Sequence, residues 1–262
     1  MKRLLPILAL IVACLALWFA PGPRRLAADG VRAERAEVIA VDDGEIALHG
    51  LVEFGTERLR VRLADGREFA AANELRAQME LDKKFKVGDT ALVVLGSDPL
   101  VVRDHWRLGW MAVLFGGFAL LLFAFGGWTG LKALFSFVFS CFAVWKFLIP
   151  LCLSGWSAEW TAFGVVSVLT AVIMYLVAGW TRKGAAAFLG AILGVVVSLG
   201  LADFFAVVLH VNGATMPFVQ TLIYSGYVDL DLADVFTGAV ILASSGAVMD
   251  LAMDIASAVE EV

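Results

Sequence analysis

Residues 237–262 read TGAVILASSGAVMDLAMDIASAVEEV, an apolar stretch long enough to cross a membrane that nevertheless carries two aspartates. Asp250 and Asp254 are four residues apart, about one helical turn, so a helix places both carboxylates on one face. Gly246 and Ser257 share that face. An aspartate in hydrocarbon costs roughly 3 kcal/mol on insertion scales, so this face must contact protein, water or a cation rather than lipid.

The composition places the whole chain in the membrane class. Of its 262 residues, 61% are hydrophobic and 17% are charged, whereas soluble domains average about 45–50% apolar and about 25% charged residues. The three cysteines, Cys14, Cys141 and Cys152, lie in apolar runs without paired spacing. This pattern disfavours both a disulfide framework and a zinc site.

Apolar runs near the length of a membrane span recur along the chain. They predict a polytopic α-helical membrane protein with about six spans. The first belongs to an uncleaved N-terminal signal anchor, residues 1–23, because it follows the basic start Met1-Lys2-Arg3. The others form a helical membrane domain, residues 108–259. The predicted spans are 4–20, 108–125, 131–153, 158–180, 185–211 and 233–259.

Residues 30–100 differ from the rest because most charges are gathered there. Residues 58–63 alternate arginine with leucine or valine, a period of two that predicts a half-buried strand. Asp65-Gly66 after it indicates a tight hairpin turn, and residues 91–95 read as another strand. Residues 38–41 and 46–48 read as a second hairpin around Asp42-Asp43-Gly44.

About five short strands in this segment predict a small extracytoplasmic β-rich domain, a barrel of the OB or SH3-like kind. Some OB barrels bind nucleic acid by stacking bases on aromatic side chains. The segment offers only Phe54, Phe69 and Phe85 for that role. We therefore expect no nucleic acid partner and interpret the domain as a spacer or docking module.

Lysine and arginine in the short loops predict the orientation in the membrane, because cytoplasmic loops are enriched in both. Lys132 and the pair Arg182-Lys183 occupy alternate loops, while loops 154–160 and 212–232 contain neither residue type. This pattern predicts a multipass protein of the bacterial cytoplasmic (inner) membrane. Its N-terminus is then cytoplasmic and residues 30–100 are extracytoplasmic.

Further candidate residues lie inside the predicted spans. Lys146 and Asp203 have similar depth and could form an ion pair, although Lys146 could instead extend to the lipid headgroups. Gly190 and Gly194 form a GxxxG stripe that favours close helix packing, either within the chain or in a dimer. Gly246 is a third candidate for helix packing.

The motif around Asp250 resembles that of the YibE/F family of predicted multipass bacterial membrane proteins. The resemblance implies an N-terminal anchor, an extracytoplasmic β-rich domain and a helical membrane domain, but no established activity. Members usually continue past this motif with more membrane helices, whereas this sequence stops at residue 262. The matching stretches are residues 246–250 (GAVMD), 252–253, 255–257, 180–183 (WTRK), 55–56, 82–83 and 87–89.

Two classes of function remain after the motifs are considered. Carboxylates four residues apart can bind a hard cation or share a proton. This favours a permease-like or ion-coupled transporter with Asp250, Asp254, Asp203, Lys146 and Ser257 as candidate ion- or proton-handling residues. Acids near a helix end can also simply meet water. The alternative function is therefore a non-transporting scaffold or envelope-assembly factor that docks partners through the β-domain.

An enzyme is not expected, because the sequence has no GxSxG nucleophile motif and no phosphate-binding loop. No cofactor is expected either. The expected partners are the lipid bilayer, a cation or proton, and a second copy of the chain or an envelope protein.

Overall fold

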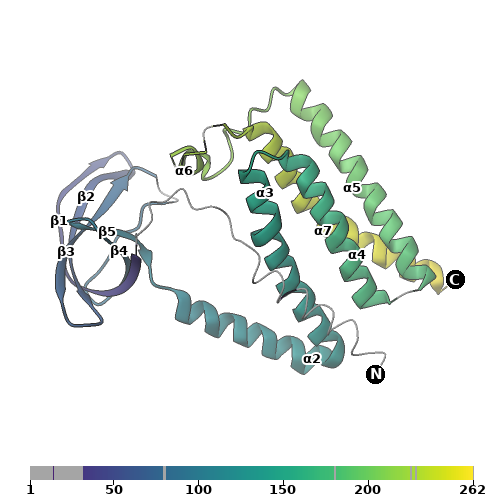
Figure 1. Ribbon diagram of the computed structural model, residues 1–262, viewed down its shortest axis with the longest axis horizontal. Helices are drawn as coiled ribbons and strands as arrows, with labels where there is room; N and C mark the ends of the chain where they lie inside the picture. Colours follow the sequence, from purple (N-terminus) through teal and green to yellow (C-terminus); the bar gives the residue numbers. More distant parts are fainter. Residues whose placement is uncertain are drawn as a thin grey trace. The chain divides into compact units, whose positions relative to one another are not determined.

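The computed structural model describes residue 14 and residues 32–78, 81–179, 181–224, 226–227 and 229–261. The predicted first span, residues 4–20, lies outside the described residues apart from Cys14. The chain divides into two compact units, Ala27–Gly116 and a second unit that comprises Met1–Leu26 and Gly117–Val262. The first contains the β-strands and the second most of the helices (Figure 1).

The first unit is a closed five-stranded barrel with the strand order β1-β2-β3-β5-β4. The long strand β1 pairs antiparallel with both β2 and β4, and β3 pairs parallel with β5. Of the two predicted barrel types, this connectivity is that of an OB-type barrel. The strands are β1 (Arg32–His49), β2 (Val52–Leu63), β3 (Glu68–Arg76), β4 (Thr90–Leu95) and β5 (Leu100–His105).

The alternation predicted for β2 is confirmed. Leu59, Val61 and Leu63 are buried in the barrel core, and the arginines between them are exposed. The predicted turn at Asp65-Gly66 is also present. Gly66 has a φ of +86°, and the Arg67 amide donates a hydrogen bond of 3.0 Å to Asp65 Oδ1.

The predicted second hairpin, around Asp42-Asp43-Gly44, is wrong. These residues lie inside the continuous strand β1, where the register with β2 shifts between Asp42 and Glu45. Asp42 pairs with Arg58 and Glu45 with Thr56, so β1 carries one extra residue and forms a β-bulge. The local turn chemistry is real, since the Gly44 amide donates to Asp42 Oδ1 at 3.0 Å. This segment bends β1 instead of reversing the chain, because β1 stays paired with β2 on both sides of the bulge.

The second part of the chain contains the membrane-length helices. Among the described residues, four helical segments are long and apolar enough to cross a membrane, so the predicted count of about six spans is not confirmed. The helices are α2 (Leu108–Ala143), η1 (Val144–Leu148), α3 (Ile149–Leu153), α4 (Ala158–Ala178), α5 (Arg182–Val208), α6 (Val219–Tyr224) and α7 (Leu232–Glu260).

The segment Leu108–Leu153 contains both the second and the third predicted span in 46 continuous helical residues. A straight helix of that length would measure about 69 Å at 1.5 Å per residue, more than twice the hydrocarbon thickness of about 30 Å. The helix breaks at Gly127, whose φ of 49° and ψ of −126° are not helical. The loop predicted between these spans is therefore a glycine corner within one helical segment.

Helices α4, α5 and α7 pack side by side (Figure 1). The first turns of α4 and α7 are joined by hydrogen bonds, and the first turn of α5 is joined to the last turn of α7 by an ion pair. Helix α5 is therefore antiparallel to both neighbours. Their shared core contains Val166 of α4, Val195 of α5 and Ile241 of α7, all of which are almost fully buried.

Candidate functional site

Asp250 and Asp254 lie on a face of α7 that points away from its neighbour α5. The opposite face packs against α5 through a stripe of apolar residues at helical spacing, Met249, Ala252, Met253 and Ala256. At about 100° per residue, the two aspartates lie roughly 130° around the helix from the centre of that stripe. Both are exposed. The acidic face of α7 is therefore separate from its packing face.

The surroundings of this acidic face are open. Neither carboxylate makes an ion pair or hydrogen bond with another of the described residues. Nothing lies within 4 Å of the position that a Cβ at Gly246 would occupy. The Ser257 hydroxyl donates a hydrogen bond of 2.8 Å to Met253 O, so it donates within α7 and not to either aspartate. The structure thus places the predicted residues on one face but gives them no partner within the described part of the chain.

A second group of acids lies where the first turns of α4 and α7 meet. The Asp234 carboxylate accepts hydrogen bonds from Ser157 Oγ at 3.0 Å, from the Ala158 amide at 2.6 Å and from the Glu159 amide at 3.1 Å. Asp234 belongs to α7 but caps the N-terminus of α4. Helix α7 has its own cap, Asp231, which accepts from the backbone amides of residues 233 and 234.

Asp203 of α5 also belongs to this group of acids, because both Asp203 and Asp234 interact electrostatically with Glu159 of α4. Neighbouring carboxyl groups can share a proton, because two like charges close together disfavour ionisation of both. Glu159 belongs both to the predicted loop 154–160 and to the start of the predicted span 158–180, and its interaction with Asp203 was not predicted. Its position two residues after the N-cap Ser157 was the available signal, because it assigns Glu159 to the first turn of a helix.

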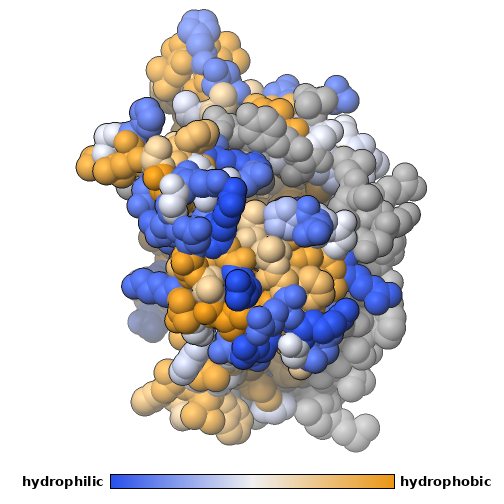
Figure 2. Space-filling model, turned by 90° about the vertical axis from the view of Figure 1, so that its left-hand side faces the viewer, coloured by the Kyte–Doolittle hydropathy of each residue, from blue (hydrophilic) through white to orange (hydrophobic). Residues whose placement is uncertain are grey.

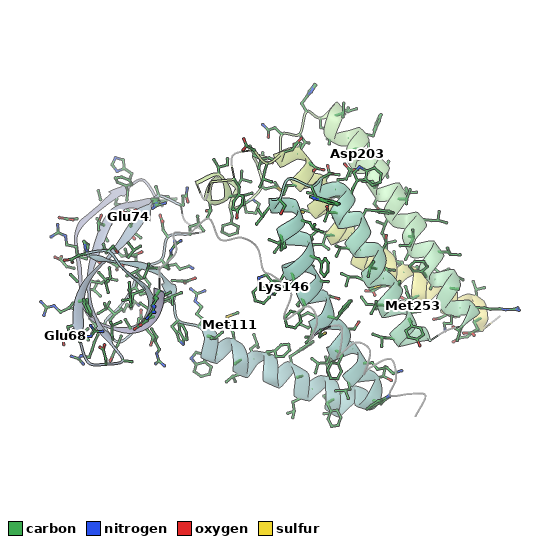
Figure 3. The ribbon with its side chains drawn as sticks, in the orientation of Figure 1. Glu68, Glu74, Met111, Lys146, Asp203 and Met253 are labelled. Carbon is green, nitrogen blue, oxygen red and sulfur yellow. The ribbon has the colours of Figure 1, made fainter. Side chains whose placement is uncertain are left out.

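The predicted pairing of Lys146 with Asp203 is not formed. Figure 3 shows the two side chains in separate parts of the helical unit. Lys146 Nζ lies 5.1 Å from the ring centroid of Trp145, a cation–π distance. Among the described residues, no group of three or more His, Cys, Asp or Glu side chains is placed to hold a metal ion.

The glycine stripe of α5 packs against α7 within the chain. A Cβ added at Gly194 would lie 2.5 Å from Val248 Cγ1, which is too close for a side chain. A Cβ at Gly190 would lie 3.8 Å from Ala252 Cβ, an ordinary contact. The α5–α7 contact is therefore closest at Gly194 and opens toward Gly190.

The barrel carries a second candidate surface at the tip of its β1–β2 hairpin. Leu48, Leu51 and Phe54 are 69%, 91% and 57% exposed there. Phe85, in contrast, is buried against the His105 ring at a centroid distance of 4.2 Å. The surface in Figure 2 mixes hydrophilic and hydrophobic residues. The exposed apolar tip is a better candidate for docking than for stacking bases, which would need several exposed aromatic rings.

The Glu57 carboxylate is fully buried in the barrel. Glu57 Oε2 accepts from Asn73 Nδ2 at 2.8 Å and Glu57 Oε1 accepts from the Phe85 amide at 3.1 Å. Asn73 Nδ2 also donates to Lys83 O at 2.6 Å. Burial raises the pKa of Glu57, and these hydrogen bonds oppose the rise only in part. The network ties residues 83–85 to the barrel wall, which indicates a structural role.

A comparison with protein families matches the chain to the family described as YibE/F-like protein over residues 114–262. The matched region contains the helices that carry Asp203, Asp250 and Asp254 and covers more than half of the chain. No curated protein matches the chain, and no solved structure matches it either.

Proposed function

The chain belongs to the YibE/F-like family of membrane proteins, and from this premise we propose that it is a permease-like protein whose ion- or proton-handling centre is Asp250 and Asp254. One observation carries the proposal. The two aspartates share one face of a membrane-length helix, exposed and one turn apart.

The energetic argument concerns the cost of that face in a membrane. An aspartate at the centre of a membrane span costs roughly 3 kcal/mol in hydrocarbon, so about 6 kcal/mol is the upper limit for two. Asp250 and Asp254 lie in the second half of α7, which lowers that cost as the helix end is approached. Water, a cation or polar protein groups must therefore cover the face. An acidic face of this kind attracts cations, and carboxylate oxygens are the ligands that hard cations and protons take.

The acids at the first turns of α4 and α7 support the same proposal in a secondary role. Asp203 and Glu159 come from different helices, and Glu159 interacts electrostatically with both Asp203 and Asp234. In this proposal they form a second place where a proton can be held, at the opposite end of α7 from Glu260. Lys146 and Ser257 then have supporting roles, in balancing charge and in shaping the acidic face.

Proton and cation flux into proteoliposomes tests the proposal. Purified protein is reconstituted and exposed to gradients of H⁺, Na⁺, Mg²⁺ and Mn²⁺. We expect flux of at least one ion in the wild type and loss of that flux in the double variant Asp250→Asn, Asp254→Asn. The matched control is Glu34→Gln, Glu37→Gln, which removes two exposed carboxylates from β1 and should keep full flux. Equal flux in wild type and the aspartate variant would contradict the proposal.

The second candidate function is a scaffold or envelope-assembly factor, and the exposed tip Leu48, Leu51 and Phe54 favours it. The two functions are separated by complementation of a strain that lacks the protein. A scaffold requires that Asp250→Asn, Asp254→Asn restores the strain and that Leu51→Ser, Phe54→Ser does not. A permease requires the opposite pattern.

The proposed orientation accompanies both functions. The N-terminus and the first turn of α5, which carries Arg182 and Lys183, are cytoplasmic, and residues 30–100 are extracytoplasmic in the bacterial inner membrane. The ion pair between Lys183 and Glu260 brings the end of α7 to the same side as that basic turn. Labelling of the variants Leu51→Cys and Arg182→Cys in intact cells tests this orientation. Only the cysteine at position 51 is expected to react with a reagent that cannot cross the membrane.

A further inference from the structure

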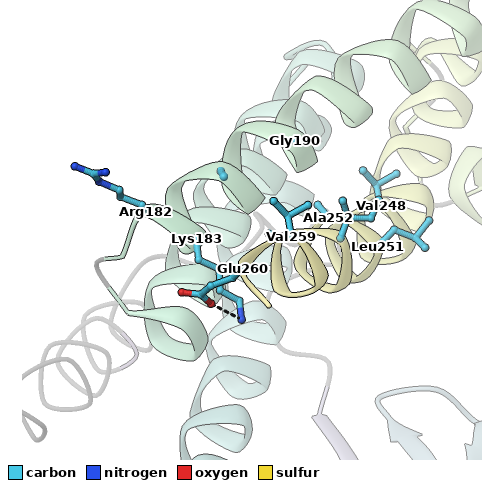
Figure 4. Close-up of a pocket in the computed structure, with 11 residues that line it drawn as sticks. Arg182, Lys183, Gly190, Val248, Leu251, Ala252, Val259 and Glu260 are labelled. Carbon is cyan, nitrogen blue, oxygen red and sulfur yellow. Dashed lines mark ion pairs between the residues drawn. The ribbon is translucent and has the colours of Figure 1, made fainter. Parts of the chain in front are cut away.

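A groove runs along the contact between α5 and α7, where the two helices separate beyond Gly194 toward the first turn of α5. Its volume is about 630 Å³, within the range of small-molecule sites of about 300–1,000 Å³. The small residues Ala186, Gly190 and Ala252 line it together with the larger apolar residues Leu251, Ile255 and Val259 of α7, which form an apolar wall. Figure 4 shows these two helices and the residues between them.

The charges of the groove are confined to one end. Arg182 and Lys183 stand in the first turn of α5, and Glu260 stands in the last turn of α7. Lys183 Nζ and Glu260 Oε2 form an ion pair of 3.1 Å, drawn as a dashed line in Figure 4, and Arg182 extends outward from the same turn. The three charged side chains that line this end, Arg182, Lys183 and Glu260, sum to a net charge of +1.

We propose that this groove binds one anionic phospholipid, with an acyl chain along the apolar wall and the phosphate at Arg182 and Lys183. The apolar part lies between two membrane-length helices, where the surrounding solvent is lipid. The charged end carries the residue types that bind phosphate. The distribution of an apolar length with cationic charge at one end only is that of a lipid, not of a soluble metabolite.

The headgroup must supply most of the selectivity. An acyl chain that enters the groove leaves other acyl chains, so it gains little from the hydrophobic effect. A phosphate that reaches Lys183 replaces the Glu260 carboxylate as the partner of this ammonium group. Glu260 therefore competes with the lipid, and its removal should strengthen binding.

Native mass spectrometry of the purified full chain in detergent tests the proposal, because it counts bound lipids and copies of the chain in the same spectrum. Phosphatidylglycerol and phosphatidylcholine with identical acyl chains are titrated separately. Each basic residue near the headgroup is worth about 1 kcal/mol, or roughly fivefold in affinity. We expect phosphatidylglycerol to bind at least about fivefold more tightly than phosphatidylcholine.

Three variants test the parts of the site. Arg182→Gln, Lys183→Gln should bring the affinity for phosphatidylglycerol down to that for phosphatidylcholine, and Glu260→Gln should raise it. Gly190→Leu fills the groove and should abolish binding of both lipids. Its control is Gly200→Leu on the same helix, where a Cβ would meet nothing within 4 Å and no effect is expected.

Two results would overturn the proposal. The first is equal affinity of the wild type for the two lipids, or unchanged binding after Arg182→Gln, Lys183→Gln. The second is a wild-type dimer that Gly190→Leu converts to a monomer without any change in bound lipid, because a second copy of the chain would then occupy the groove.

Discussion

Asp234→Ala should destabilise the helical unit strongly, although Asp234 is only half-buried. The change removes one carboxylate that accepts three hydrogen bonds from α4, at 2.6, 3.0 and 3.1 Å. Two of the donors are backbone amides of the first turn of α4, which have no partner within that helix. Loss of an N-cap costs about 1 kcal/mol, and a hydrogen bond to a charged group contributes about 1.5–3 kcal/mol.

These contributions do not add fully, because water reaches the exposed side of the site and replaces part of what is lost. We therefore expect a loss of about 3 kcal/mol in the free energy of unfolding. The loss has a second physical source, since Asp234 ties α7 to α4 and thus links two elements 75 to 77 residues apart in sequence.

Reversible unfolding in mixed detergent micelles, followed by circular dichroism, measures this loss. The matched control is Asp231→Ala, which removes the cap of α7 alone and should cost about 1 kcal/mol. Ser157→Ala completes a double-mutant cycle with Asp234→Ala. Because Ser157 Oγ donates to Asp234, the two changes should be non-additive. The reasoning is refuted if Asp234→Ala costs no more than Asp231→Ala, or if the cycle shows no coupling.

Two further perturbations test the packing of the helices and the buried carboxyl of the barrel. Gly238→Ala should lower the free energy of unfolding by about 1–3 kcal/mol through overpacking, because the new Cβ would lie 2.9 Å from Ala158 O. The control Gly246→Ala should not lower it, since its Cβ would meet nothing within 4 Å. Unfolding in micelles measures both variants. Burial raises the pKa of Glu57, so its contribution to stability is present below the pKa of the unfolded chain and is lost as the pH rises through the folded pKa. Thermal unfolding of wild type and Glu57→Gln from pH 4 to 8 should therefore show wild type losing stability relative to the variant as pH rises, and a constant difference would contradict this.

Local patterns succeeded wherever the environment could be read from neighbouring residues. The alternation in β2 predicted its buried and exposed sides, because successive residues of a strand point to opposite faces. The hairpin prediction from Asp42-Asp43-Gly44 was wrong because it used neighbouring residues only. A bulge and a turn use similar residues, and the pairing with the partner strand decides which of the two forms.

The candidate site shows the same division. Four residues of spacing sufficed to place Asp250 and Asp254 on one helix face. The sequence could assign Glu159 to a first helical turn, but it could not show that Asp203 lies near Glu159 and not near Lys146, because this depends on which helices are neighbours.

The sequence by itself determined that this is a membrane protein and where its apolar segments lie. Each spanning helix needs about 20 consecutive apolar residues and forms its backbone hydrogen bonds within itself, so a spanning segment can be recognised from its own residues. Only the tertiary structure decided that Asp234 caps α4, that the glycine stripe of α5 packs against α7, and that α2 changes direction at Gly127. These features depend on contacts between residues far apart in the chain or on how two spans are joined. Composition and spacing do not contain that information.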